Sequence, residues 1–171
     1  AVPVDTSLAV EDYLAAADIG TTRTKVGDVY VAAAASDPGV AFGGEPSGAW
    51  IWPAETLCPD GPLAACKLVE LAAERPLGER AAEIDTYPIR RQNVGVDDKT
   101  SVMDRVRDRV TEQFETVSTL DGVRVDTDDG WFLVRASGTQ PLVRLTAEAQ
   151  DAARAEDLLE RASELIAVAR R

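Results

Sequence analysis

The stretch Arg135-Ala-Ser-Gly-Thr-Gln-Pro-Leu-Val-Arg144 gathers several residue types that bind phosphate. Arg135 and Arg144 carry planar guanidinium groups, whose donors match the oxygens of a phosphate. Ser137 and Thr139 add hydroxyl groups, and Gly138 permits a tight turn in which consecutive N–H groups point toward one anion. The stretch is therefore a candidate phosphate-binding loop. The alternative is a surface turn with two solvated arginines.

The sequence around this loop predicts an antiparallel sheet. Apolar runs at 131–134 and 142–145 predict a strand on each side of the loop, with no helix N-terminus behind it. Two Asp-Gly pairs, at 121–122 and 129–130, are typical of hairpin turns between further strands. A helix with Ser101 as its N-cap precedes these strands, and a helix of regular apolar period follows Asp151. This part of the chain is predicted to be α+β, with helices packed on the sheet.

The N-terminal part alternates strands with helices instead. Strands are predicted at 19–24, 40–42 and 49–52, and helices at 29–35 and after Asp60. This order is typical of an α/β domain with a parallel or mixed sheet. The pattern changes within an extended segment, 87–96. We therefore expect two domains, 1–92 and 93–171.

Charge and composition exclude several classes of function. The net charge of −12 argues against nucleic acids and acidic membranes as partners. Thirty acidic residues, with arginine far outnumbering lysine, resemble the proteins of salt-loving microbes, although an ordinary acidic protein is the alternative. No signal peptide or membrane span is visible, and we expect a cytoplasmic protein.

The sequence shows no clear motif for a metal site or for a catalytic nucleophile. There is no histidine, which excludes Ser-His catalysis and the usual zinc sites. Cys58 and Cys66 have neither metal nor redox spacing, and we expect buried free thiols. The segment 126–130 begins like a calcium loop but departs from the pattern at Trp131 and Ser137. We expect a hairpin turn there, and no metal ligands in this chain.

A second loop, Gly44-Glu45-Pro46-Ser47-Gly48, is suited to sugar hydroxyls. Its carboxylate and hydroxyl are two residues apart and framed by glycines, so both can face one ligand. A glycine-rich hairpin turn is the alternative. Lys25 follows a predicted strand beside Gly27, where it could reach a ligand or stay solvated. A sugar loop and a phosphate loop on two packed domains together imply a sugar phosphate as ligand.

The two loops, in this order, resemble the motifs of the α-D-phosphohexomutase family, which includes phosphoglucosamine mutase, phosphomannomutase and phosphoglucomutase. The family's sugar loop is G-E-x-S-G, and its phosphate loop is R-x-S-G-T-E-P with a further arginine downstream. The stretch from Arg23 to Asp28 also resembles the family. The similarity covers essentially the whole chain, but only the third (α/β) and fourth of the family's four domains. The fourth resembles the TATA-binding-protein fold.

The resemblance implies an intramolecular phosphotransferase, an isomerase that interconverts hexose 6-phosphate and hexose 1-phosphate through a phosphoserine and a bisphosphorylated sugar. It implies Mg²⁺ as cofactor and a hexose bisphosphate as activator. The phosphoserine and magnesium loops belong to the family's N-terminal domains, so no catalytic residue is expected here and the chain alone should be inactive. The implied sugar contacts are Glu45, Ser47 and Gly48, with Lys25 close by. The implied phosphate contacts are Arg135, Ser137, Gly138, Thr139 and Arg144.

Two positions depart from the family pattern. Ala49 replaces the usual histidine or asparagine, which leaves open whether glucosamine or mannose phosphate is preferred. Gln140 replaces glutamate and so changes a charge beside the phosphate loop. Two other functions stay open: a sugar-phosphate-binding module without catalysis, and a structural domain whose loops are only turns. Saturable binding of hexose phosphates would exclude the structural domain.

Overall fold

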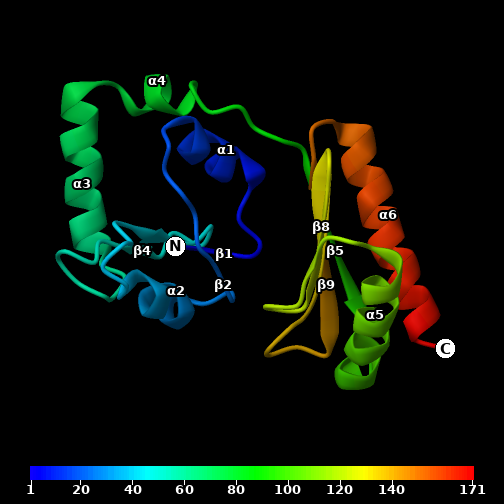
Figure 1. Cartoon of the computed structure of the whole chain (residues 1–171). Coiled ribbons are helices and arrows are strands. Elements are labelled where there is room, and N and C mark those ends of the chain that lie inside the picture. The colour runs from blue at the N-terminus through cyan, green and yellow to red at the C-terminus, as the bar shows by residue number, and fades with distance from the viewer. The chain divides into compact units, whose positions relative to one another are not determined.

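The computed structural model describes residues 1–171 and divides the chain into two compact units, Ala1–Thr86 and Tyr87–Arg171 (Figure 1). The predicted boundary between residues 92 and 93 falls inside strand β5 (Ile89–Gly95), which pairs along its whole length within the second unit. No helix is both long and apolar enough to cross a membrane.

The first unit has short strands and mixed pairing. Strand β1 (Val2–Pro3) runs parallel to β2 (Arg23–Thr24), and β3 (Gly43–Gly44) runs antiparallel to β4 (Trp50–Ile51). The amide of Gly44 donates to the carbonyl oxygen of Ala1 over 3.0 Å, which brings β3 beside β1. The helices are α1 (Leu8–Ala16), α2 (Asp28–Ala35), α3 (Gly61–Glu74) and α4 (Leu77–Ala81). The predicted mixed α/β class is confirmed. The strands are shorter than expected, and the strand expected at 40–42 lies at Gly43–Gly44 instead.

The core of the first unit is small. Val31 and Ala35 of α2 pack with Ile51 of β4 and are fully buried. Helix α3 contributes little to it, because only Ala64 is buried along its length and Val69 is 68% exposed. Cys58 and Cys66 are both exposed. The prediction of buried thiols was therefore wrong: Cys58 precedes α3, and the apolar spacing around Cys66 does not place α3 against the core.

The second unit is a five-stranded antiparallel sheet in the order β5-β9-β8-β7-β6. Its remaining strands are β6 (Val117–Ser118), β7 (Val123–Thr127), β8 (Gly130–Ala136) and β9 (Leu142–Ala149). Helices α5 (Lys99–Gln113) and α6 (Ala152–Ala169) pack on one face of the sheet (Figure 1). Residues 126–130 form the expected hairpin turn, with Thr127 paired to Gly130. The predicted α+β class is confirmed.

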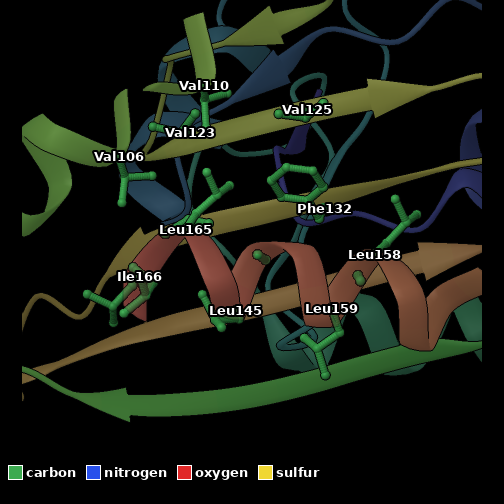
Figure 2. Packing of buried hydrophobic residues seen from close by; sticks show 14 of the residues in the cluster. Val106, Val110, Val123, Val125, Phe132, Leu145, Leu158, Leu159, Leu165 and Ile166 are labelled. Carbon is green, nitrogen blue, oxygen red and sulfur yellow. The ribbon is translucent and has the colours of Figure 1, made fainter. Parts of the chain in front are cut away.

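One continuous core joins both helices to the sheet, as Figure 2 shows. Leu158 and Ile166 on α6 face Phe132 and Leu145 on the sheet. Val106 of α5 belongs to the same buried cluster. This is the face that the regular apolar period of α6 predicts. The core holds β8 and β9, and therefore the loop between them, on a packed support.

The start of α5 differs from the prediction. Its N-cap is Asp98, whose Oδ1 accepts from the amide of Ser101 over 3.1 Å. Ser101 lies inside the first turn and donates its hydroxyl to Asp98 Oδ2 over 2.6 Å. Both residue types favour the cap position, and the helix begins at the earlier one.

The sheet face opposite the helices carries polar and charged side chains. Trp131 Nε1 donates to the buried Glu148 Oε2 over 2.7 Å, and the Arg124 guanidinium lies 4.1 Å from the centre of the Trp131 ring. Arg124 in turn donates to Asp126 over 2.8 and 2.9 Å. At the end of the face farther from the 137–141 loop, the charged side chains therefore have partners within the chain.

Candidate functional site

The candidate phosphate loop connects β8 to β9 at the end of a regular antiparallel ladder. The amide of Ser137 donates to the carbonyl oxygen of Leu142 over 2.9 Å, which closes the loop at its base. Arg135 and Arg144 lie directly opposite each other in the register of β8 and β9. Directly opposite residues share one face of a sheet, so both guanidinium groups leave the same face beside the loop.

The two hydroxyls of the loop have different surroundings. Ser137 is buried, and its Oγ accepts from the amide of Gln140 over 3.3 Å, which leaves the hydroxyl hydrogen available. Thr139 is exposed at the tip. A ligand at the tip would therefore find one free hydroxyl and one that is positioned by the turn.

Gly138 lies in the loop without a left-handed backbone conformation. The glycines with positive φ are Gly27, Gly48 and Gly122, so the backbone at Gly138 does not require glycine. A Cβ atom added at position 138 would meet no atom within 4 Å. The turn therefore does not depend on a left-handed conformation at Gly138, and there is open space beside this residue.

Lys99 holds the loop from outside it. Its Nζ donates to the carbonyl oxygens of Ser137 over 2.6 Å and of Gln140 over 2.9 Å. Lys99 is the first residue of α5, and its side chain reaches this loop, which itself joins two strands as expected. The ammonium group fixes two carbonyls that would otherwise be free to turn toward an anion, and it adds a positive charge.

The two loop arginines differ in how they are engaged. The Arg135 Nη1 atom lies 3.5 Å from Asp121 Oδ2. The Arg135 side chain is 19% exposed and that of Asp121 is 23% exposed. Arg144 is exposed and makes no hydrogen bond or ion pair. Arg135 is thus oriented by a carboxylate, and Arg144 is free to meet a ligand.

The candidate sugar loop is a tight connection between β3 and β4. Glu45 and Ala49 close it through an amide-to-carbonyl hydrogen bond of 3.0 Å, and the Gly48 amide donates to the Glu45 carbonyl over 2.9 Å. Gly48 has φ of 90°, a conformation that favours glycine. The loop therefore keeps Glu45 and Ser47 on a short, constrained turn.

The Glu45 carboxylate joins this loop to a second one. Its Oε1 accepts from the amide of Gly27 over 2.7 Å, and its Oε2 accepts from the Ser47 hydroxyl over 3.4 Å. Gly27, with φ of 131°, is the N-cap of α2 and follows Lys25 closely. Lys25 Nζ lies 5.6 Å from the centre of the Tyr30 ring, within cation–π range. Glu45, Ser47 and the turn after Lys25 thus lie close together, and their contact with a sugar stays a prediction.

A hollow of about 280 Å³ adjoins the sugar loop. Glu45 and Pro46 form one side of it, and Thr6 and Ser7 at the start of α1 form another. Its walls are otherwise mostly apolar: Val2, Val10, Phe42 and Trp50. The loop is therefore open on the side of this hollow.

Three contributors were missed at the level of sequence: Lys99, Asp121 and the backbone amide of Gly27. Asp121 belongs to an Asp-Gly pair, a pattern that indicates only a turn. Lys99 is 38 positions from Ser137, so spacing gave no signal. Gly27 contributes a backbone group, which residue type does not reveal.

The residues present do not form a magnesium site. No three His, Cys, Asp or Glu side chains gather in a way that could hold a metal ion. The carboxylates at the two loops are each engaged by donors of the chain itself, Glu45 by Gly27 and Asp121 beside Arg135. We therefore assign no metal-dependent step to this chain.

Comparison with known families covers nearly the whole chain. The sequence profile of phosphoglucomutase/phosphomannomutase, alpha/beta/alpha domain III, matches residues 1–87. The profile of the phosphoglucomutase/phosphomannomutase C-terminal domain matches residues 92–165.

Individual proteins give the same result. The chain is 49% identical over 162 residues to a probable phosphoglucosamine mutase of Methanopyrus kandleri, covering 92% of this chain and 36% of that protein. The chain thus spans about a third of that relative's length. A phosphoglucomutase/phosphomannomutase family protein of Burkholderia thailandensis superposes with a TM-score of 0.84 at 22% identity, covering 98% of this chain and 37% of that one. N-acetylphosphoglucosamine mutase of Aspergillus fumigatus, solved with GlcNAc-6P and magnesium, gives 0.73 at 15% identity, covering 99% and 39%. These two structures support the fold.

Proposed function

Because the chain belongs to the phosphoglucomutase/phosphomannomutase family, we propose that it is the substrate-binding part of a phosphohexomutase. The reaction would interconvert hexose 6-phosphate and hexose 1-phosphate. The relative named phosphoglucosamine mutase, at 49% identity, favours glucosamine phosphate over mannose phosphate as substrate.

The observation that carries the proposal is the phosphate loop. Arg135 and Arg144 stand opposite each other beside a turn whose carbonyls are fixed by Lys99. Two guanidinium groups, the Ser137 and Thr139 hydroxyls and the open space at Gly138 offer donors and room for one phosphate. In this role the loop would hold the phosphate that is not being transferred.

The sugar loop would bind sugar hydroxyls. The Glu45 carboxylate is positioned by the Gly27 amide and would accept from sugar hydroxyls, while Ser47 would donate or accept. Gly48 gives the turn its shape, and Lys25 adds a positive charge beside it. Fixed donors and acceptors of this kind lower the entropy cost of orienting a substrate.

Phosphoryl transfer itself is assigned to residues outside this chain, as are the phosphoserine and the magnesium ligands. A hexose bisphosphate is the proposed activator. The net charge of −12 supports the further proposal of a salt-loving source organism, because high salt screens repulsion among so many acidic residues. A cytoplasmic location is also part of the proposal.

The test is Arg135→Ala in the full-length protein, with Arg109→Ala as the control, since Arg109 is an exposed arginine on α5. We expect kcat/KM for glucosamine phosphate to fall about a hundredfold in the first variant, because a charge-assisted pair to phosphate is lost. The control should keep its activity. Unchanged kcat and KM in Arg135→Ala would contradict the phosphate-loop assignment.

Two further measurements separate the other functions. Mutase turnover by the 171-residue chain alone would contradict the assignment of chemistry to residues outside it. Saturable hexose phosphate binding by a full-length protein without mutase activity would favour a binding module. The absence of saturable binding would favour a structural domain.

A further inference from the structure

Strand β5 carries two polar side chains on the same sheet face as the loop arginines. Asn93 lies directly opposite Arg144, and Arg144 lies directly opposite Arg135, so the three form one row across β5, β9 and β8. Arg91, two residues from Asn93, shares that face because side chains alternate along a strand. The next residues along the strands, Val94 and Val143, pack toward the core on the helix side. The row of Asn93, Arg144 and Arg135 therefore lies on the other face of the sheet.

The side chains at this end of the face are unengaged. The side chains of Arg91, Asn93 and Arg144 are exposed and make no hydrogen bond or ion pair. By contrast, Arg90 on the other face donates to Glu156 over 3.0 Å. The chain has a net charge of −12, yet here two arginine side chains without a carboxylate partner lie beside a neutral amide. This part of the surface therefore carries a local positive charge.

Sheet geometry brings these groups within reach of one ligand. Neighbouring strands are about 4.8 Å apart, so directly opposite side chains begin about 5 Å apart. Diagonal neighbours such as Arg91 and Arg144 are about 7–8 Å apart, a gap that arginine side chains span. The Asp121 carboxylate lies beside Arg135, at the other end of the row, and so leaves the β5 side without a counter-charge.

We infer that β5 completes the phosphate site. Asn93 donates from its side-chain amide to an oxygen of the phosphate that Arg144 binds, and Arg91 supplies a second positive charge to the same monoester. The sequence motifs gave no sign of this, because β5 precedes the loop by more than 40 positions and becomes its neighbour only through pairing with β9. The inference rests on the proposed function, since it adds residues to the same site.

The experiment compares two adjacent amides. Asn93→Ala removes the proposed contact, and Gln92→Ala removes an exposed amide on the opposite face of the same strand. Calorimetric titration of the full-length protein with inorganic phosphate and with glucosamine 6-phosphate measures affinity, and circular dichroism checks folding. We expect Asn93→Ala to weaken both ligands about tenfold, as for a hydrogen bond to a charged group, and Gln92→Ala to bind as the unaltered protein does.

Two more variants sharpen the result. Asn93→Asp keeps the shape but places a negative charge beside the phosphate, so it should weaken binding more than Asn93→Ala does. Arg91→Gln should weaken binding about threefold and lower its salt dependence, because it removes a charge that is not directly hydrogen-bonded. Equal affinities of Asn93→Asp and the unaltered protein would overturn the inference.

The outcomes separate this inference from the proposed function. If Arg135→Ala loses binding while Asn93→Ala and Gln92→Ala bind equally, only the role of β5 is overturned. If Arg135→Ala also binds normally, or if neither ligand binds saturably, the proposed phosphate site fails and the role of β5 fails with it. A loss confined to the Asn93 and Arg91 variants and to Arg135→Ala supports both.

Discussion

Lys99 Nζ donates a hydrogen bond to the carbonyl oxygen of Ser137 over 2.6 Å and so ties the start of α5 to the phosphate loop. The same group donates to the Gln140 carbonyl over 2.9 Å. Both carbonyls are thereby directed toward a cation. A loop fixed in this way presents hydroxyls and arginines to an anion without first having to reorganise, which favours binding.

Replacing Lys99 tests this arrangement. Lys99→Met keeps the apolar stem and removes the ammonium group, so the loop should loosen and phosphate affinity should fall about tenfold. Hydrogen exchange of the amides at 138–140 should become faster in the same variant. Lys67→Met is the control, because Lys67 has only a surface contact of 3.5 Å with Glu70. Unchanged exchange in Lys99→Met would contradict a positioning role.

Glu45 should act on the sugar and not on the phosphate. Glu45→Ala removes the acceptor for the Gly27 amide, so exchange of that amide should rise and hexose phosphate affinity should fall. Glu45→Gln keeps an acceptor but no charge, and should protect the Gly27 amide better than alanine does. Inorganic phosphate should bind both variants as it binds the unaltered protein. A matching loss of phosphate affinity would show that Glu45 does not act on the sugar alone.

Local patterns predicted the second unit well. Two Asp-Gly pairs gave its hairpins, and the regular period of α6 identified the face that is buried. Both features depend on residues that are close together in the sequence. The observed core is consistent with both. The two candidate ligand loops could be proposed for the same reason, since each is a short segment with its polar groups close together.

Features that depend on distant pairing could not be predicted. Lys99 reaches the loop because α5 starts beside it, and Asn93 joins Arg144 because β5 pairs with β9. Cys66 was misplaced because the apolar spacing of α3 resembles that of a buried helix, although only Ala64 is buried. At α5, Asp98 and Ser101 are both good N-caps, and sequence alone does not choose between them.

The core of the second unit should be sensitive at Leu158. Leu158→Ala leaves a cavity under a fully buried side chain and should lower the free energy of unfolding by about 2–5 kcal/mol. Val168→Ala on the same helix is the control, because Val168 is 40% exposed and should change stability little. Native-state hydrogen exchange of α6 and β8 amides measures both. Equal effects would contradict the placement of Leu158 in the core.

The N-cap of α5 gives a pH dependence with a defined sign. The side-chain and backbone hydrogen bonds from Ser101 hold the pKa of Asp98 below its ordinary value of 3.8. Since the folded pKa is lowered, the ionised cap stabilises the protein above about pH 3.8, and this contribution is lost as the pH falls through the folded pKa. Asp98→Asn keeps a good cap without a titrating group. The stability difference between the two proteins, measured by urea unfolding, should therefore shift against the unaltered protein between about pH 6 and about pH 2. A difference that stays constant across this range would show that Asp98 gains nothing from its charge at the helix start.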